Sequence, residues 1–154
     1  MQRLWRVTYE ELHEDTLSAP EKELIQAAAK AAEHAYAPYS KFHVGAAVRL
    51  RDGRIYTGNN QENAAYPSGL CAERTLLFSL GAQSLISSVE ILAVYSPHSL
   101  SPVMPCGACR QVMHEYQEKS QNRWVLLFAG ASSLVYRFVG VESLLPFAFV
   151  WRPA

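Results

Sequence analysis

The sequence predicts a three-layer α/β/α sandwich around one mixed five-stranded sheet. Segments with helical periodicity alternate with short apolar segments typical of strands, and this alternation is characteristic of helices packed against a sheet. A length of 154 residues fits one domain, which we expect to span residues 1–154. Residues 1–19 are predicted to be an N-terminal extension of that domain.

The first predicted helix covers residues 21–36, where alanine, leucine and isoleucine recur at helical spacing. Pro20 suits the first turn of this helix, and a proline two residues beyond the segment ends it. Residues 42–49 alternate between apolar side chains and other types, which predicts a strand. That strand ends at the hairpin signal Arg51-Asp52-Gly53, and residues 54–58 are predicted to be the return strand.

The second half of the chain repeats this alternation of helices and strands. Apolar segments bounded by loops predict the strands, and a leucine-rich face followed by Gly81 predicts the second helix. In order, the predictions are a polar surface loop at 59–68, helix 71–81, strand 89–95, helix 106–118, strands 124–129 and 134–138, and a last helical turn at 141–145.

All three cysteines fall in two short segments, Cys71-Ala72-Glu73-Arg74 and Pro105-Cys106-Gly107-Ala108-Cys109. A Cys-x-x-Cys pair and one distant cysteine can supply three thiolates to one Zn²⁺, whereas a structural zinc site almost always has a fourth protein ligand. Three ligands leave one position open for water, whose pKa zinc lowers from roughly 16 to about 7. Glu73 is then placed to move protons to and from that water.

The predicted helix starts at Cys71 and Cys106 favour thiolate chemistry. A helix N-terminus carries partial positive charge and free N–H groups, which stabilise a thiolate. Cys106 and Cys109 are three residues apart, so they share one helix face and can share a metal. Arg74 lies three residues after Cys71, where it can donate hydrogen bonds to the sulfurs and offset their negative charge.

Composition limits the partners and the compartment that we expect. Fourteen Lys and Arg balance fourteen Asp and Glu, so no broad basic surface favours nucleic acid. No segment has the length and apolar character of a membrane span, and the charged N-terminal stretch does not match a signal peptide. Three cysteines without an export signal favour a reducing compartment, and the predicted localisation is cytoplasmic.

Four motifs together resemble cytidine deaminases of the short, single-domain type. The resemblance covers residues 21–149, and related zinc deaminases share a looser pattern in which His often replaces the first Cys. The motifs are Pro-Tyr-Ser-x-Phe-x-Val-Gly-Ala-Ala at 38–47, Gly-x-Asn-x-Glu-Asn-Ala at 58–64, Cys-Ala-Glu-Arg-Thr at 71–75 and Pro-Cys-Gly-x-Cys-Arg-Gln at 105–111.

The resemblance implies hydrolytic deamination of cytidine and 2′-deoxycytidine to uridine and 2′-deoxyuridine, with release of ammonia, as part of pyrimidine salvage. One zinc ion per chain would be held by Cys71, Cys106 and Cys109. Glu73 would take a proton from the zinc-bound water and pass it to N3 of the base while hydroxide attacks C4. One carboxylate then serves as base and acid in turn, which is most efficient when its pKa lies near the working pH.

The resemblance also implies a set of substrate-binding residues. It places the base against Phe42, gives the ribose hydroxyl to Asn60 and Glu62, and lets backbone groups of Ala72 and Pro105 contact the edge of the base. Buried polar groups that pair with a sugar hydroxyl would reject analogues that lack it, because those groups would be left without a partner.

A homotetramer is the assembly that the resemblance implies, with a C-terminal aromatic residue from a neighbouring chain closing the pocket. Phe149 aligns with that aromatic, and Phe147 is a weaker candidate. The N-terminal extension is longer than in many members of the family, and residues 150–153 have no assigned role. Either segment could alter an interface between chains.

Other functions remain open at this point. A related deaminase could act on another aminopyrimidine nucleoside, such as blasticidin S. The zinc site could instead be structural and non-catalytic, or Cys106 and Cys109 could form a redox pair. A structural site would need a fourth ligand from the histidines His13, His34, His43, His98 and His114.

Each assigned residue also has a simpler interpretation. Glu73 could be an ordinary acid at a helix N-terminus, and Phe42 could be a core residue of a strand. Asn60 and Glu62 could be polar loop residues, and Arg74 could be a surface charge. The combination of motifs favours the functional interpretation for all five.

Overall fold

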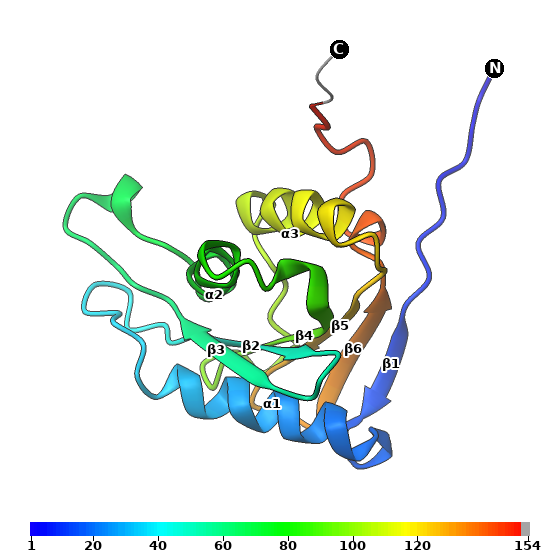
Figure 1. Ribbon diagram of the computed structural model, residues 1–154. Coiled ribbons are helices and arrows are strands. Elements are labelled where there is room, and N and C mark those ends of the chain that lie inside the picture. Colours follow the sequence, from blue (N-terminus) through cyan, green and yellow to red (C-terminus); the bar gives the residue numbers. More distant parts are fainter. Residues whose placement is uncertain (152–154) are drawn as a thin grey trace.

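The computed structural model describes residues 1–151, so residues 152–154 of the predicted domain lie outside the described residues. Helix α1 (Ala19–Ala32) covers one face of the sheet, and α2 (Ala72–Ala82) and α3 (Gly107–Ser120) cover the other (Figure 1). This arrangement confirms the predicted three-layer α/β/α sandwich. Within residues 1–151, no helix combines the length and the apolar character that crossing a membrane requires.

The sheet has six strands, so the predicted count of five was wrong. It is mixed, as predicted, because β4 and β5 pair in parallel and every other neighbouring pair is antiparallel. The strand order is β1-β6-β5-β4-β2-β3. The strands are β1 (Glu10–His13), β2 (Gly45–Leu50), β3 (Ile55–Asn59), β4 (Val89–Tyr95), β5 (Val125–Ala129) and β6 (Leu134–Val139).

The sixth strand, β1, comes from the N-terminal extension and pairs with β6. Tyr9 holds the extension in place, because its ring stacks on Phe138 with centroids 5.1 Å apart and meets Tyr136 edge-on at 5.2 Å. Arg137 adds an ion pair with Glu10 at 2.6 Å. The sequence did not predict this strand for two reasons. Its contacts join residues that are far apart along the chain, and the four residues Glu-Glu-Leu-His show no alternation of apolar and polar side chains.

Helix α1 ends at Ala32, four residues before the predicted end. The backbone leaves the helix because the N–H of Tyr36 donates to the carbonyl of Asn60 at 3.0 Å. Strand β2 likewise begins at Gly45 rather than at residue 42. A Cβ atom at Gly45 would overlap the backbone of α1 at Ala28. Only glycine at this position therefore allows α1 to pack so closely against β2.

The two layers of the core follow the alternation of side chains along β5. Leu126 and Phe128 pack with Trp124 beneath α2 and α3, whereas Leu127 faces Leu24 on α1. All five side chains are fully buried. The last predicted helical turn is a shorter 3₁₀ turn at Val141–Ser143. The packed layer beneath α2 and α3 fixes these helices on one face of the sheet, where both carry cysteines at their N-termini.

Candidate active site

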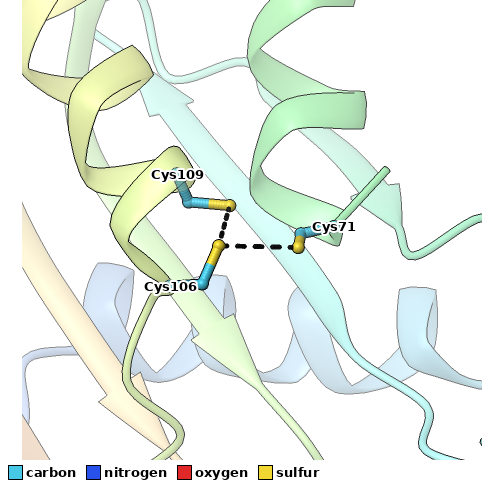
Figure 2. A group of neighbouring side chains, drawn as sticks. All are labelled: Cys71, Cys106 and Cys109. Carbon is cyan, nitrogen blue, oxygen red and sulfur yellow. Dashed lines mark hydrogen bonds between the residues drawn. The ribbon is translucent and has the colours of Figure 1, made fainter. Parts of the chain in front are cut away.

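The three cysteine sulfurs converge where α2 and α3 begin (Figure 2). Cys71 is the N-cap residue of α2, Cys106 is the N-cap residue of α3, and Cys109 lies in the first turn of α3. The Sγ atoms of Cys71 and Cys106 are 3.8 Å apart, and those of Cys106 and Cys109 are 3.5 Å apart. Two segments that are distant along the chain thus bring their sulfurs into one cluster.

The cluster fits a zinc ion. Two thiolates on a tetrahedral zinc with Zn–S bonds of about 2.3 Å lie about 3.8 Å apart, close to both distances given above. All three sulfurs lie within 4.8 Å of one another. Within residues 1–151, this is the only group of three or more potential ligands with such spacing, and it contains no histidine. The donor set therefore has three protein ligands, the number typical of catalytic zinc sites.

Glu73 lies in the first turn of α2 and is only 4% exposed. Burial, together with the nearby charge of Cys71, raises the pKa of the Glu73 carboxyl to about 7. The Glu73 carboxyl interacts with both Cys71 and Cys109, so it lies beside the sulfur cluster rather than in solvent. Such a group can exchange a proton near neutral pH, which suits a general base or acid.

Hydrogen bonds tune the charge of the sulfur cluster. The thiol of Cys109, followed by the guanidinium of Arg74, lowers the pKa of Cys71 to about 5. The interaction with Cys71, followed by burial, raises the pKa of Cys109. Arg74 Nη2 lies 3.6 Å from Cys71 Sγ, so the guanidinium is directed at the cluster rather than at solvent. Metal ions bind cysteines as thiolates, so metal binding at this cluster would release the thiol protons.

Three other predicted site residues form a second group, in which Phe42 lies in the loop before β2 and Asn60 and Glu62 follow β3. Asn60 donates from Nδ2 to the carbonyl of Phe42 at 2.9 Å and accepts at Oδ1 from the N–H of Val44 at 2.8 Å. The carboxylate of Glu62 accepts from the N–H of Tyr39 at 2.9 Å. Phe42 lies in this loop, is 37% exposed, and does not belong to the strand predicted for it.

Three further predicted residues have distinct surroundings. Ala72 is fully buried as the first residue of α2, where helix N–H groups lack partners within the helix. The carbonyl of Pro105 accepts from Arg110 Nε at 2.8 Å. Phe149 is 72% exposed, and its carbonyl accepts from Gln111 Nε2 at 2.9 Å. The tail that carries Phe149 is therefore attached to α3 through its backbone, with its ring exposed.

Sequence reasoning gave no role to two residues that contact this group. The hydroxyl of Ser40 donates to the carboxylate of Glu62 and accepts from the N–H of Phe42 at 3.0 Å. The ring of His98 lies 5.9 Å from that of Phe42, between centroids. Ser40 stands in the first of the four motifs, which is the one signal that could have identified it. His98 lies in a loop without any such motif.

The fold and the sulfur cluster define a zinc-binding enzyme of the deaminase class. The family described as the cytidine and deoxycytidylate deaminase zinc-binding region matches residues 18–124. The chain belongs to this family, which confirms the resemblance seen in the four motifs.

Relatives and solved structures agree with that assignment. A cytidine deaminase of Sporosarcina psychrophila is 50% identical over 95 residues, which are 62% of this chain and 68% of that protein. The crystal structure of cytidine deaminase from Burkholderia pseudomallei has a TM-score of 0.74 and 41% identity, and the match covers 82% of this chain and 97% of that one. The structure from Mycobacterium tuberculosis has a TM-score of 0.67 and 35% identity, covering 87% and 100%.

Proposed function

We propose that this protein deaminates cytidine and 2′-deoxycytidine by hydrolysis, yielding uridine or 2′-deoxyuridine and ammonia. The observation that carries the proposal is the convergence of three thiols at the starts of α2 and α3, with the buried Glu73 in the first turn of α2. Relatives named cytidine deaminase support the substrate class. A role in pyrimidine salvage follows from the products, which are nucleosides that a cell can reuse.

Cys71, Cys106 and Cys109 would hold one zinc ion per chain. When bound, zinc supplies Lewis acidity that makes water nucleophilic near neutral pH. The neighbouring helix N-termini and Arg74 would stabilise the thiolate form of the cysteines. Together they would favour the thiolate form that zinc requires, with the three sulfurs held at the starts of two helices.

Glu73 would carry out the proton transfers of the reaction. It accepts a proton as water attacks C4 of the pyrimidine and delivers that proton to N3. It then moves the remaining proton of the new C4 hydroxyl to the 4-amino group, which leaves as ammonia while the C4 carbonyl forms. Its burial keeps bulk water from competing for the same proton. The atoms balance, because one water is consumed and one ammonia is released for each nucleoside.

Phe42, Asn60 and Glu62 would bind the rest of the nucleoside. The exposed ring of Phe42 offers an apolar surface to the base, and the ionised Glu62 offers an acceptor to a ribose hydroxyl. Backbone groups of Ala72 and Pro105 would contact the edge of the base. The two helix starts, the loop before β2 and the residues that follow β3 would thereby supply different parts of one substrate site.

We further propose a homotetramer in which Phe149 reaches the pocket of a neighbouring chain. The large exposed fraction of this ring supports that role, since it packs little against its own chain. The free cysteines and the balanced charge support a reducing, cytoplasmic location and a small-molecule substrate rather than nucleic acid.

The deciding experiment follows cytidine loss by absorbance, together with ammonia release, in zinc-loaded protein and in Glu73→Gln. We expect wild type to form uridine and the variant to lose roughly 100- to 10,000-fold in kcat. Metal analysis serves as the control, with one zinc per chain expected in both proteins. A variant that deaminates cytidine as fast as wild type would contradict the role of Glu73.

A substrate panel tests the specificity of the proposal. It contains cytidine, 2′-deoxycytidine, cytosine and blasticidin S at equal concentrations. We expect turnover of the two nucleosides, because Glu62 and Asn60 require a sugar hydroxyl. Activity on blasticidin S alone would overturn the proposed substrate, and zinc binding without any turnover would indicate a structural site.

A further inference from the structure

The loop that carries Phe42 is held by side chains rather than by a sheet or a helix. Residues 41–44 belong to no regular element, and Lys41 adopts a left-handed conformation with φ of 58°. Residues other than glycine adopt that conformation at a cost, so contacts from elsewhere must stabilise it. Both backbone polar groups of Phe42 receive such contacts, its carbonyl from Asn60 and its N–H from Ser40.

Ser40 connects this loop to the carboxylate of Glu62. Its hydroxyl donates to Glu62 Oε1 and accepts from the N–H of Phe42 at 3.0 Å. Its backbone N–H donates to the same carboxylate at 3.2 Å. A single hydroxyl thus links the proposed sugar-binding group, Glu62, to the residue proposed to contact the base. No other described side chain bonds both Glu62 and the backbone of Phe42.

The carboxylate of Glu62 retains capacity for one more donor. A carboxylate has about four acceptor positions, and the donors described here are the N–H of Tyr39, the N–H of Ser40 and the hydroxyl of Ser40. These bonds, led by that of the Ser40 hydroxyl, lower the pKa of Glu62 and keep it ionised. An ionised carboxylate with a free position is a strong acceptor for a hydroxyl.

A cavity opens beside this carboxylate. Its volume is about 450 Å³, and it is lined by Tyr39, Ser40, Glu62, Asn63 and Tyr66. A sugar hydroxyl that enters from the cavity can occupy the remaining acceptor position of Glu62. The same hydroxyl would then fix the carboxylate, and through it the hydroxyl of Ser40 and the backbone of Phe42.

We propose that Ser40 is a positioning residue that couples recognition of the sugar hydroxyl at Glu62 to the placement of the Phe42 ring. This inference rests on the proposed function, because that function assigns Glu62 to the sugar and Phe42 to the base. Because of this coupling, binding of the sugar strengthens binding of the base. A substrate without the hydroxyl makes no bond to Glu62, and it also leaves the loop that carries Phe42 less firmly held.

The test compares Ser40→Ala with wild type on two substrates, cytidine and 2′,3′-dideoxycytidine. The second substrate lacks the 2′- and 3′-hydroxyls and keeps only the 5′-hydroxyl, so no hydroxyl on the sugar ring is available to bind Glu62 and act through Ser40. For cytidine we expect Ser40→Ala to raise KM roughly tenfold with little change in kcat, because it removes binding common to ground state and transition state. For 2′,3′-dideoxycytidine we expect KM to change less than about threefold.

Two further variants separate coupling from a loss of folding. Ser40→Thr keeps a hydroxyl and should restore the KM for cytidine. Ser87→Ala removes an exposed hydroxyl far along the chain, with no side-chain hydrogen bond among residues 1–151, and should match wild type. Zinc content and melting temperature are measured for all variants, so that a misfolded protein is recognised.

Calorimetry of cytidine binding to Glu73→Gln, with and without Ser40→Ala, gives a readout independent of turnover. We expect Ser40→Ala to weaken this binding roughly tenfold, and binding of 2′,3′-dideoxycytidine far less. Equal losses for both nucleosides would show that Ser40 merely holds the loop, and an unchanged affinity would exclude any role. If wild type fails to deaminate cytidine, the proposed function fails, whereas the calorimetric comparison still decides the coupling. Absence of any binding would overturn both.

Discussion

Arg74 Nη2 lies 3.6 Å from Cys71 Sγ, and both residues stand at the start of α2. Arg74 Nε is buried and has no hydrogen-bond partner among residues 1–151. The hydrogen bond to Cys71 raises the pKa of Arg74, so its positive charge persists beside the sulfurs. A guanidinium that is partly buried and directed at a thiol cluster points to a function at that cluster rather than at the surface.

We expect Arg74→Gln to weaken zinc affinity or kcat/KM roughly 10- to 100-fold, because a group that bonds a metal ligand stabilises its charge and orientation. Zinc affinity is measured by competition with a chromophoric chelator, and kcat/KM with cytidine. Arg74→Lys keeps the positive charge but lacks the planar guanidinium with its several donors. Its zinc affinity and kcat/KM should therefore lie between those of wild type and Arg74→Gln. Wild-type affinity and activity in Arg74→Gln would assign the residue to packing alone.

Phe149 tests the proposed contribution of a neighbouring chain. Phe149→Ala should raise KM for cytidine roughly threefold to tenfold, the range expected from loss of an aromatic contact. Phe147→Ala is the matched control, because the ring of Phe147 lies 5.5 Å from that of Trp5 in its own chain. Light scattering after size-exclusion chromatography should give the mass of a tetramer. A monomeric mass would refute both the assembly and the role of Phe149.

Tyr9 provides a test of the sixth strand. Its ring contacts Phe138 and Tyr136, so Tyr9→Ala should lower the free energy of unfolding by about 1–2 kcal/mol. Tyr9→Phe keeps the ring and loses only an exposed hydrogen bond to Glu11, so it should stay within about 0.5 kcal/mol of wild type. Denaturation with urea measures both. Equal stability of all three proteins would show that the ring does not hold β1.

Glu21 links α1 to β6 and makes stability depend on pH. Its carboxylate accepts from the N–H of Ser18 and from Arg137 Nε, each at 3.0 Å. Burial opposes ionisation, but these bonds hold the pKa of Glu21 below its ordinary value. A lowered pKa in the folded state gives stability above the unfolded pKa, about 4.3, and that stability is lost as pH falls through the folded value.

We therefore expect Glu21→Gln to be about 1 kcal/mol less stable than wild type at pH 7, with the difference closing below about pH 4. Glu118→Gln, at an exposed position without a side-chain hydrogen bond among residues 1–151, is the control and should follow wild type throughout. The free energy of unfolding is measured by urea titration at half-unit pH steps from 3 to 7, a range chosen around the ordinary pKa of about 4.3. A constant difference between Glu21→Gln and wild type would contradict the ion-pair explanation.

The cluster of three sulfurs could be predicted from the sequence because each of its two segments carries a short local motif. Cys106 and Cys109 lie together at the start of α3, and Cys71 lies at the start of α2. The three layers could also be predicted, since periodicity reports which face of a segment is buried. Strand β1 could not be predicted, because its pairing depends on Tyr9 and on residues of β6 that lie more than 120 positions away in the sequence.

The loop before β2 shows the same limit at the site. Phe42 belongs to an alternating pattern that predicts a strand, yet Asn60 and Ser40 take both of its backbone polar groups. A local bond to Ser40 and a longer-range bond from Asn60 override the strand pattern there. The motifs predicted that Asn60 and Glu62 bind substrate. Only the folded structure shows that the hydroxyl of Ser40 lies between Glu62 and Phe42.

Strand β1 forms one outer edge of the sheet and carries two adjacent carboxylates, Glu10 and Glu11. An exposed edge strand offers unpaired backbone groups to the edge of another molecule, which is a common route to aggregation. Glu10 forms an ion pair with Arg137 of β6, and Glu11 adds a second charged residue to a strand of only four residues. Short edge strands with charged side chains are one means by which proteins oppose such pairing, and the extension that completes the sheet supplies both features.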